Sequence, residues 1–299
     1  MLQTQLRKTE TAMRRFCQTM VLALAILLLG ACSGVQIGYR HADIYLAWKV
    51  NEYFDLDGQQ FNLVRPAIDS ALRWHRTVEL PEYANLLGTV QVKLRSKVTV
   101  ADVRWLDDEI GRRVRASVSR MALEGAPILA TITPVQIEEL EQRLAKDNND
   151  FYEKFVRGSM EKQQTRRVKR FVEGAEHWTK FVTDEQQQKI EHIVAEAPQR
   201  YALALEERKR VQREFVAILR EGNSASALVP RLNAWIANWQ GGRSAEYSRL
   251  YEISMDQRAR MAVAITDSLT SPQRAHALAK LQAYIEDMRA LAVEAAKKD

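Results

Sequence analysis

Cysteine is scarce in this sequence, since only Cys17 and Cys32 occur among 299 residues. Two thiols are too few for a disulfide framework or for a metal site built from cysteines. Glycine and proline are also few, with 12 and 7 residues. Ala, Leu, Glu, Gln, Arg and Lys are frequent instead, which favours helices over sheets. The fold must therefore be stabilised by an apolar core packed between helices.

Long apolar runs are absent except for one, Met20–Leu29, which is about half the length that crosses a bilayer. Arg14 and Arg15 precede this run, and Gly30-Ala31-Cys32 follows it. A basic start, a short apolar stretch and small residues at the end are typical of a cleaved signal peptide. We therefore interpret residues 1–31 as a signal peptide. A signal peptide that begins at Met13 would be more compact, so we expect translation to start there.

Cys32 directly after the small pair resembles the lipobox of bacterial lipoproteins, in which the thiol receives diacylglycerol before cleavage. The resemblance implies a membrane anchor on Cys32, a lipidated tether over residues 32–38 and a helical domain over residues 39–299. Ser33 follows the cysteine and no Asp occupies the next positions. In Gram-negative lipoproteins this implies transfer to the outer membrane. The expected location is the periplasmic face of that membrane.

A strong charge of one sign is also absent once the signal peptide is removed. Residues 1–31 carry Arg7, Lys8, Arg14 and Arg15 against Glu10, so the net charge of +6 falls to +3. The mature chain then has 40 basic and 37 acidic residues. A nucleic-acid-binding protein shows a concentrated basic excess. We therefore expect no nucleic-acid partner.

The remaining chain reads as helices separated by turn residues, with no convincing strand. Pro81 is placed as the first residue of a helix, and Gly125 and Pro127 close another. Pro198 should kink a third helix or break one of its backbone hydrogen bonds. We predict an all-α, elongated bundle of about eight helices, compatible with two sub-bundles that meet near 125–134. The expected helices cover 39–54, 58–77, 81–94, 99–123, 134–172, 184–221, 227–266 and 278–292.

One helix-start motif occurs four times: Thr or Asp, with Gln at the third place after it. The motif predicts a capping box, in which the Thr or Asp oxygen accepts from the N3 amide and the Gln reaches back. Four well-started helices explain it fully. The four cap and glutamine pairs are Asp57 and Gln60, Thr133 and Gln136, Thr183 and Gln186, and Thr270 and Gln273.

Two resemblances rest on these and neighbouring residues. Thr133-Pro134-Val135-Gln136 and Thr270-Ser271-Pro272-Gln273 resemble the LTxxQ motif of small periplasmic chaperones, all-helical proteins that hold unfolded clients. Over nearly the whole chain, the lipobox, an aromatic helix, Asp55-Leu56-Asp57, the Trp74-His75-Arg76 triplet and an Arg-rich helix resemble a family of uncharacterised Gram-negative lipoproteins. That family implies a helical lipoprotein and no assigned activity.

The densest polar and aromatic cluster is Trp74, His75, Arg76 and Glu79. His75 and Glu79 are four residues apart on a helix, so the carboxylate can face the ring and raise its basicity. A general base is one interpretation. The alternative, which we favour, is a polar network that fixes the turn before Pro81. No nucleophile or second acid stands beside the pair in the sequence.

A second candidate is the basic run from Arg157 to Arg170, in which Arg166, Arg167 and Arg170 represent a surface for an anionic partner. The alternative, which we favour, is a solvated face of an ordinary amphipathic helix, because the charges are spread over several turns and do not all share one face. His192 and Glu196 are also four residues apart, but no third metal ligand accompanies them.

Phosphate-binding loops, Gly-x-Ser-x-Gly and Ser-x-x-Lys motifs are missing. We therefore expect no catalytic residue, no metal, no cofactor and no small-molecule substrate. The favoured function is a non-enzymatic interaction or scaffolding role for a lipid-anchored envelope protein with an unidentified protein partner. A holder of unfolded clients is the alternative, and an enzyme centred on His75 and Glu79 is the third.

Overall fold

The computed structural model describes residues 34–222 and 224–297. The predicted signal peptide over 1–31 and the predicted lipid attachment site at Cys32 lie outside the described residues. The chain divides into two units, residues 1–42 and 43–299. The helix α2 (Gly34–Arg40) belongs to the first unit. Every described element of both units is helical, which confirms the all-α prediction.

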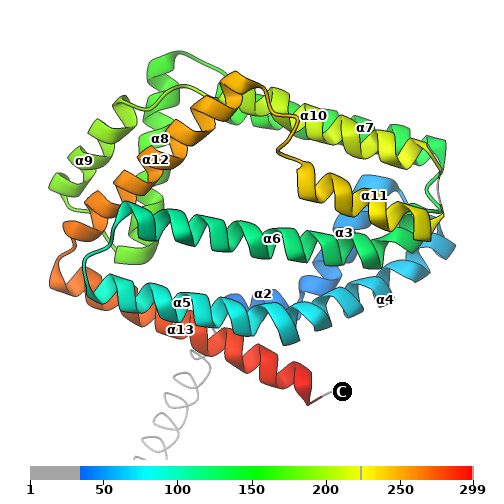
Figure 1. The fold of residues 1–299 in the computed structure, drawn as a ribbon, viewed down its shortest axis with the longest axis horizontal. Coiled ribbons are helices and arrows are strands. Elements are labelled where there is room, and N and C mark those ends of the chain that lie inside the picture. The colour runs from blue at the N-terminus through cyan, green and yellow to red at the C-terminus, as the bar shows by residue number, and fades with distance from the viewer. Residues whose placement is uncertain (1–33, 223, 298–299) are drawn as a thin grey trace, which may run out of the picture. The chain divides into compact units, whose positions relative to one another are not determined.

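The second unit holds more helices than the eight expected, because several long predicted helices are divided (Figure 1). The elements are α3 (Ala42–Phe54), α4 (Gly58–Trp74), the π-helical η1 (His75–Glu79), α5 (Leu80–Arg95), α6 (Val100–Leu129), α7 (Pro134–Phe151), the π-helical η2 (Tyr152–Val156), α8 (Met160–Thr179), α9 (Asp184–Ala195), α10 (Tyr201–Arg220), α11 (Ala225–Asn238), α12 (Ala245–Asp267) and α13 (Ser271–Ala296).

Three proline positions test the predicted helix ends. Pro81 does stand in the first turn of α5, but η1 joins α4 to α5 without a break. Pro198 was expected to kink one continuous helix or break one bond in it, but it lies in a full break between α9 and α10. The predicted helix end at Gly125 and Pro127 is wrong, since α6 continues to Leu129. Ala126 there is buried in an apolar cluster with α11, and this burial outweighs one lost backbone bond.

The four predicted capping boxes are all present, and their glutamines meet in two pairs. In the pair that we call the first clasp, Gln60 and Gln136 each donate from Nε2 to the other's Oε1, at 3.0 and 2.6 Å. Gln186 and Gln273 form the second clasp in the same way, at 3.0 and 2.9 Å. All four side chains are buried. Each clasp is therefore a polar contact inside the core.

The amide groups of a clasp have further partners in the backbone. In the second clasp, Oε1 of Gln273 also accepts from the N–H of Thr270 at 2.9 Å, and its Nε2 donates to the carbonyl of Phe181 at 2.9 Å. Gln186 makes the corresponding bond to the carbonyl of Ser268 at 3.0 Å. A buried polar network whose members are all paired specifies one arrangement. The clasps thus determine which helix N-termini lie next to each other.

The clasps divide the second unit into two halves with the same order of elements. In each half, a helix leads to a clasp glutamine, a long helical hairpin follows, and another clasp glutamine starts the last helix. The first half runs from α3 to η2, and the second half from α8 to α13. The halves join at residues 157–159, whereas residues 125–134 fall inside the first half.

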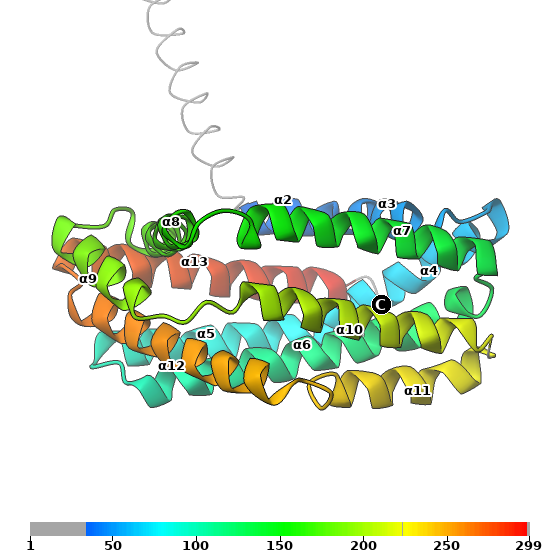
Figure 2. The ribbon, with the colours of Figure 1, turned by 90° about the horizontal axis from the view of Figure 1, so that it is seen from above.

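The last helix of each half packs against the other half. Helix α7 lies on α10 and helix α13 lies on α5, while α6 packs along α11 and α12 (Figure 2). Leu281 of α13 is buried with Leu94 of α5, and Ile137 of α7 is buried near Leu219 of α10. The last helix of each half, α7 or α13, therefore holds the two halves together.

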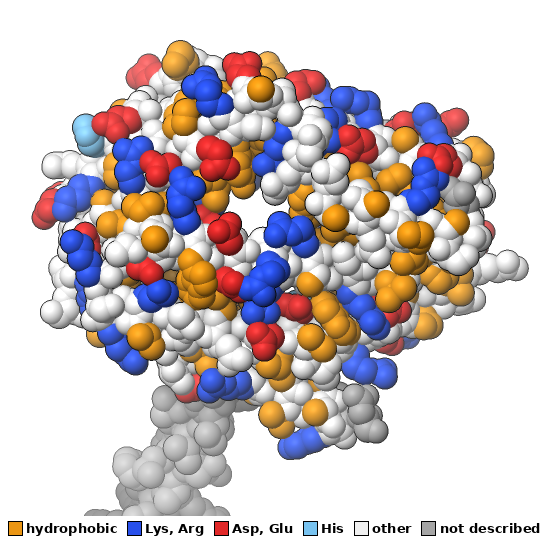
Figure 3. Space-filling view, viewed as in Figure 1, with side chains coloured by type: hydrophobic (Ala, Val, Ile, Leu, Met, Phe, Trp, Pro, Cys, Tyr) orange, Lys and Arg blue, Asp and Glu red, His pale blue; other side chains and the backbone are white. Residues whose placement is uncertain are grey.

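Ion pairs add polar contacts between α6 and α12. Arg104 lies 3.6 Å from Glu252 and 3.4 Å from Asp256, and Arg258 lies 3.4 Å from Asp107. The face of the molecule in Figure 3 is hollowed in its middle, and charged side chains of both signs gather around the hollow. No helix in the described part of the chain is long and apolar enough to cross a bilayer.

Candidate functional site

The Trp74 cluster lies where α4 passes through the π-helix η1 into α5. Short π-helical segments occur often at functional sites, so this position is a candidate site. His75 is partly buried, and this burial lowers its pKa below the ordinary histidine value. The prediction that Glu79 would raise the basicity of His75 is therefore wrong. A neutral imidazole is favoured at neutral pH.

Glu79 is buried beside an arginine of α6. Arg113 lies 3.6 Å from the carboxylate of Glu79 and donates to Glu82 at 3.0 Å. The Arg113 guanidinium also lies 5.7 Å from the ring of Tyr83, and burial followed by the charge of Glu79 raises the pKa of that tyrosine. The buried carboxylate is thus compensated by a fixed cation.

The other side of the cluster is compensated in the same way. Arg120 of α6 lies 6.0 Å from the ring of Trp74 and forms an ion pair with Glu124. Ser70 donates to Glu124 at 2.7 Å and accepts from Arg120 at 3.2 Å. These contacts join α4 and η1 to α6 and leave both arginines paired with acids. The geometry favours the structural interpretation of the cluster, a network that holds the helices together.

The three arginines of the predicted anionic-partner surface do not share one solvated face. Arg167 is only 8% exposed and donates to the carbonyl of Ala197 at 3.2 Å. Arg170 donates to the hydroxyl of Tyr201 at 2.7 Å, whereas Arg166 bonds to the carbonyl of Arg157. Arg167 therefore points inward because α8 packs that side against the α9–α10 connection. The predicted open surface is wrong for this residue.

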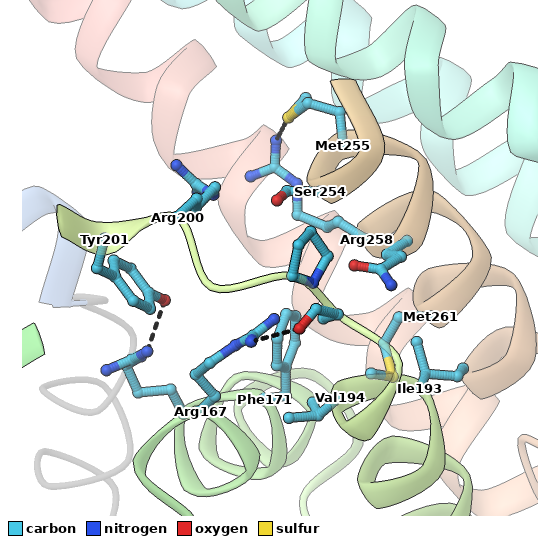
Figure 4. A pocket seen from close by; sticks show the side chains of 14 residues that line it. Arg167, Phe171, Ile193, Val194, Arg200, Tyr201, Ser254, Met255, Arg258 and Met261 are labelled. Atoms are coloured by element: carbon cyan, nitrogen blue, oxygen red, sulfur yellow. Dashed lines mark hydrogen bonds between the residues drawn. The ribbon is translucent and has the colours of Figure 1, made fainter. Parts of the chain in front are cut away.

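Arg167 and Arg170 instead line a cavity of about 260 Å³, which we call the arginine pocket (Figure 4). Arg200 reaches it from the α9–α10 connection, and Arg258 reaches it from α12. Its remaining lining side chains are apolar or neutral. They include Phe171, Ile193, Val194, Met261, Tyr201 and Gln257.

The charge in the arginine pocket is poorly compensated. No carboxylate lines the cavity. Arg258 has Asp107 at 3.4 Å, but among the residues that the structure describes no acid lies within ion-pair distance of Arg167, Arg170 or Arg200. Burial lowers the pKa of Arg167; nearby Tyr201 opposes this shift, and the neighbouring arginines add to it. A buried cation such as Arg167 is costly unless an anion pairs with it.

Two further groups at the pocket lack partners. Helix α10 begins at Tyr201, and its N-cap residue, Arg200, makes no side-chain capping bond to the first amides. Uncapped N–H groups and the helix dipole favour an anion there. Gln257 is 6% exposed, and its Oε1 has no hydrogen-bond partner among the described residues. A ligand with acceptor oxygens and a hydroxyl suits both groups.

Sequence reasoning found Arg167 and Arg170 but missed Arg200, Gln257 and Arg258. Pro198 was the available signal for Arg200, because the helix break at this proline sets an arginine directly at a helix start. No local pattern marks Gln257 or Arg258, whose position depends on how α12 packs against α9. The gathered arginines give the pocket a donor set that suits an oxyanion.

Other candidate ligand sets are weak. His192 and Glu196 lie 3.3 Å apart on an exposed helix face. Among the described residues, no three His, Cys, Asp or Glu side chains come together in a way that could hold a metal ion.

Comparison with protein families gives one match. Residues 52–247 match the model of a family of unknown function (DUF6279). The match includes the Trp74 cluster and three of the four pocket arginines, but not Arg258. No curated protein and no solved structure matches the chain.

Proposed function

The chain belongs to this family of unknown function, and from its own residues we propose a non-enzymatic interaction protein that binds an anionic group of its partner. The arginine pocket is the observation that carries this proposal. Four arginines from three segments converge on one cavity, and the cavity supplies no carboxylate. An oxyanion on a partner would supply the missing negative charge and accept several charge-assisted hydrogen bonds.

The proposed setting is the cell envelope. A diacylglycerol anchor on Cys32 would tether the helical domain to the periplasmic face of the outer membrane. The lipobox-like sequence and the absence of Asp after the cysteine support this location. Labelling with palmitate and a shift in intact mass, both lost in Cys32→Ser, would test the anchor. Recovery of the protein at inner-membrane density would contradict the location.

Binding at the pocket is tested by titrating the protein with pyrophosphate in a calorimeter. Arg200→Gln and Arg258→Gln each remove one charge-assisted contact, so we expect about a tenfold loss of affinity for each. Arg289→Gln is the matched control, because Arg289 is an exposed arginine on α13 outside the pocket. Binding should also weaken as salt increases.

The proposal fails if pyrophosphate does not bind saturably, or if Arg289→Gln reduces affinity as much as the pocket variants do. Circular dichroism of each variant separates loss of binding from loss of fold.

A holder of unfolded clients is the second candidate, and an apolar stripe on α6 favours it. Ile110, Val114 and Met121 share one side of that helix and are 41%, 40% and 48% exposed. Suppressed aggregation of a denatured client at near-stoichiometric ratio, lost in Val114→Ser with Met121→Ser, would support it. Unchanged aggregation in the presence of the protein would count against it.

A further inference from the structure

Helix α3 has an unusual combination of composition and exposure. Its sequence, ADIYLAWKVNEYF, is apolar around most of its circumference, yet none of its residues is buried. Ile44, Tyr45 and Trp48 are 64%, 56% and 55% exposed. A helix that is apolar on all sides is normally covered on all sides. The outer face of α3 therefore requires a covering surface.

The exposed face continues onto α4 as an apolar groove. Ile44, Ala47 and Trp48 of α3 and Phe61 and Ile68 of α4 line a cavity of about 370 Å³. Cations stand at its margin. The Lys49 ammonium lies 4.6 Å from the Trp48 ring and forms an ion pair with Glu52 at 2.6 Å. Arg65 lines the groove together with one acid, Asp43.

This composition fits the boundary of a lipid bilayer. Trp and Tyr favour the level of the lipid headgroups, where the apolar ring and the polar atom both find suitable surroundings. Lysine and arginine nearby pair with phosphate groups. At 13 residues α3 is about 20 Å long, too short to cross the hydrocarbon core, so it would lie along the surface.

The length of chain before α3 selects the bilayer as the occupant. Residues 33–41 separate Cys32 from the start of α3, and an extended chain covers at most about 3.5 Å per residue. An acylated Cys32 would therefore hold α3 within about 30 Å of the membrane surface. We propose that the exposed face of α3, with Phe61 of α4, rests on the bilayer and orients the helical domain. This inference rests on the anchor proposed above.

Site-directed spin labelling tests the inference in the full chain. With the signal peptide removed and Cys32 acylated, a cysteine introduced at Tyr45 is the sole free thiol. Val92→Cys on α5 is the matched control, since Val92 is 64% exposed on a helix of the opposite layer (Figure 2). In liposomes the Tyr45→Cys label should meet oxygen and be shielded from a water-soluble nickel chelate. The Val92→Cys label should show the reverse.

The inference is overturned if both labels are equally accessible to the nickel chelate. It is also overturned if the Tyr45→Cys label is shielded from both reagents, because that pattern indicates a protein partner or a second copy. Intact mass reports separately whether Cys32 is acylated. If it is not, the anchor fails, and Tyr45→Cys in a chain with Cys17→Ser and Cys32→Ser is measured with excess liposomes. Nickel accessibility there overturns the membrane face itself.

Discussion

Both halves of the second unit contain the same kind of clasp, but they differ in the space near it, which is filled in the first half and open in the second. Trp74 stands 17 residues after the cap Asp57, and Arg200 stands 17 residues after the cap Thr183. Arg120 precedes Thr133 by 13 residues, as Gln257 precedes Thr270. The Trp74 cluster and the arginine pocket therefore occupy corresponding places in the two halves.

The first half closes this place and the second half opens it. In the first half, η1 carries the helix onward without a break, and Arg120 is neutralised by Glu124. In the second half the helix stops before Pro198, and Met261 stands in the register position of Glu124. A cavity and unneutralised arginines result. The same arrangement of helices thus contains a structural network in one half and the proposed binding site in the other.

The helices that precede the clasps also differ between the halves, in composition and in exposure. Ile44 stands 13 residues before Asp57, and Arg170 stands 13 residues before Thr183. Helix α3 is apolar and exposed, whereas α8 is basic and turns Arg167 inward. The first half presents an apolar face and the second half presents a cationic pocket. Both proposed contact surfaces therefore lie where the halves differ, not at the shared clasps.

The largest expected effect comes from breaking the second clasp. Gln273→Leu would remove both amide bonds to Gln186 and the bond to the carbonyl of Phe181, and it would leave the N–H of Thr270 without its acceptor. We expect a loss of about 3–4 kcal/mol in the free energy of unfolding. Gln136→Leu in the less deeply buried first clasp should cost less. Urea denaturation measures both.

Gln187→Leu is the matched control for the clasp, because Gln187 is the next residue and lies on the solvent side of α9. Its change should stay within about 0.5 kcal/mol. Equal effects of Gln273→Leu and Gln187→Leu would show that the clasp is not a stabilising unit.

The second-largest effect is on ligand binding. The substitution gives the arginine pocket an acidic side chain, as the Trp74 cluster already has. Gln257→Glu is nearly isosteric and places a carboxylate among the pocket arginines. The new charge should compete with the ligand, so pyrophosphate affinity should fall at least about tenfold. Gln282→Glu on the exposed surface of α13 is the control. Calorimetry that finds unchanged affinity in Gln257→Glu would remove the pocket as the binding site.

The sequence predicted what is local and missed what is distant. The capping boxes and the helix disruption at Pro198 follow from residues within a few positions of each other. The pairing of clasp glutamines does not, because the partners lie 76 and 87 residues apart. The inward turn of Arg167 likewise depends on the carbonyl of Ala197, 30 residues away. Residues that join a site only through the packing of distant helices could therefore not be predicted from local patterns.

The third effect is a pH dependence confined to the first half. Burial lowers the pKa of His75 in the folded protein, so the unfolded chain binds more protons near and below pH 6.5. The stability contributed by neutral His75 is present above that pH and is lost as pH falls towards its folded pKa. The corresponding place in the second half is occupied by Tyr201, not by a histidine. Between pH 7.5 and 5.5, His75→Gln should lose less stability than the parent protein in urea denaturation. A parallel loss in both would contradict this assignment.

The smallest effect compares the starts of the second long helix in each half. Thr99 caps α6 through a complete capping box with Asp102, while Ser224 before α11 makes no side-chain capping bond. Thr99→Ala should therefore cost about 1 kcal/mol, and Ser224→Ala only a few tenths. Lys93 and Thr99 lower the pKa of Asp102 to about 2, so the contribution of that carboxylate is present above its unfolded pKa and fades as pH falls towards 2. The difference between the two alanine variants should accordingly shrink in acid. Equal costs at neutral pH would mean that the capping difference between the halves has no energetic consequence.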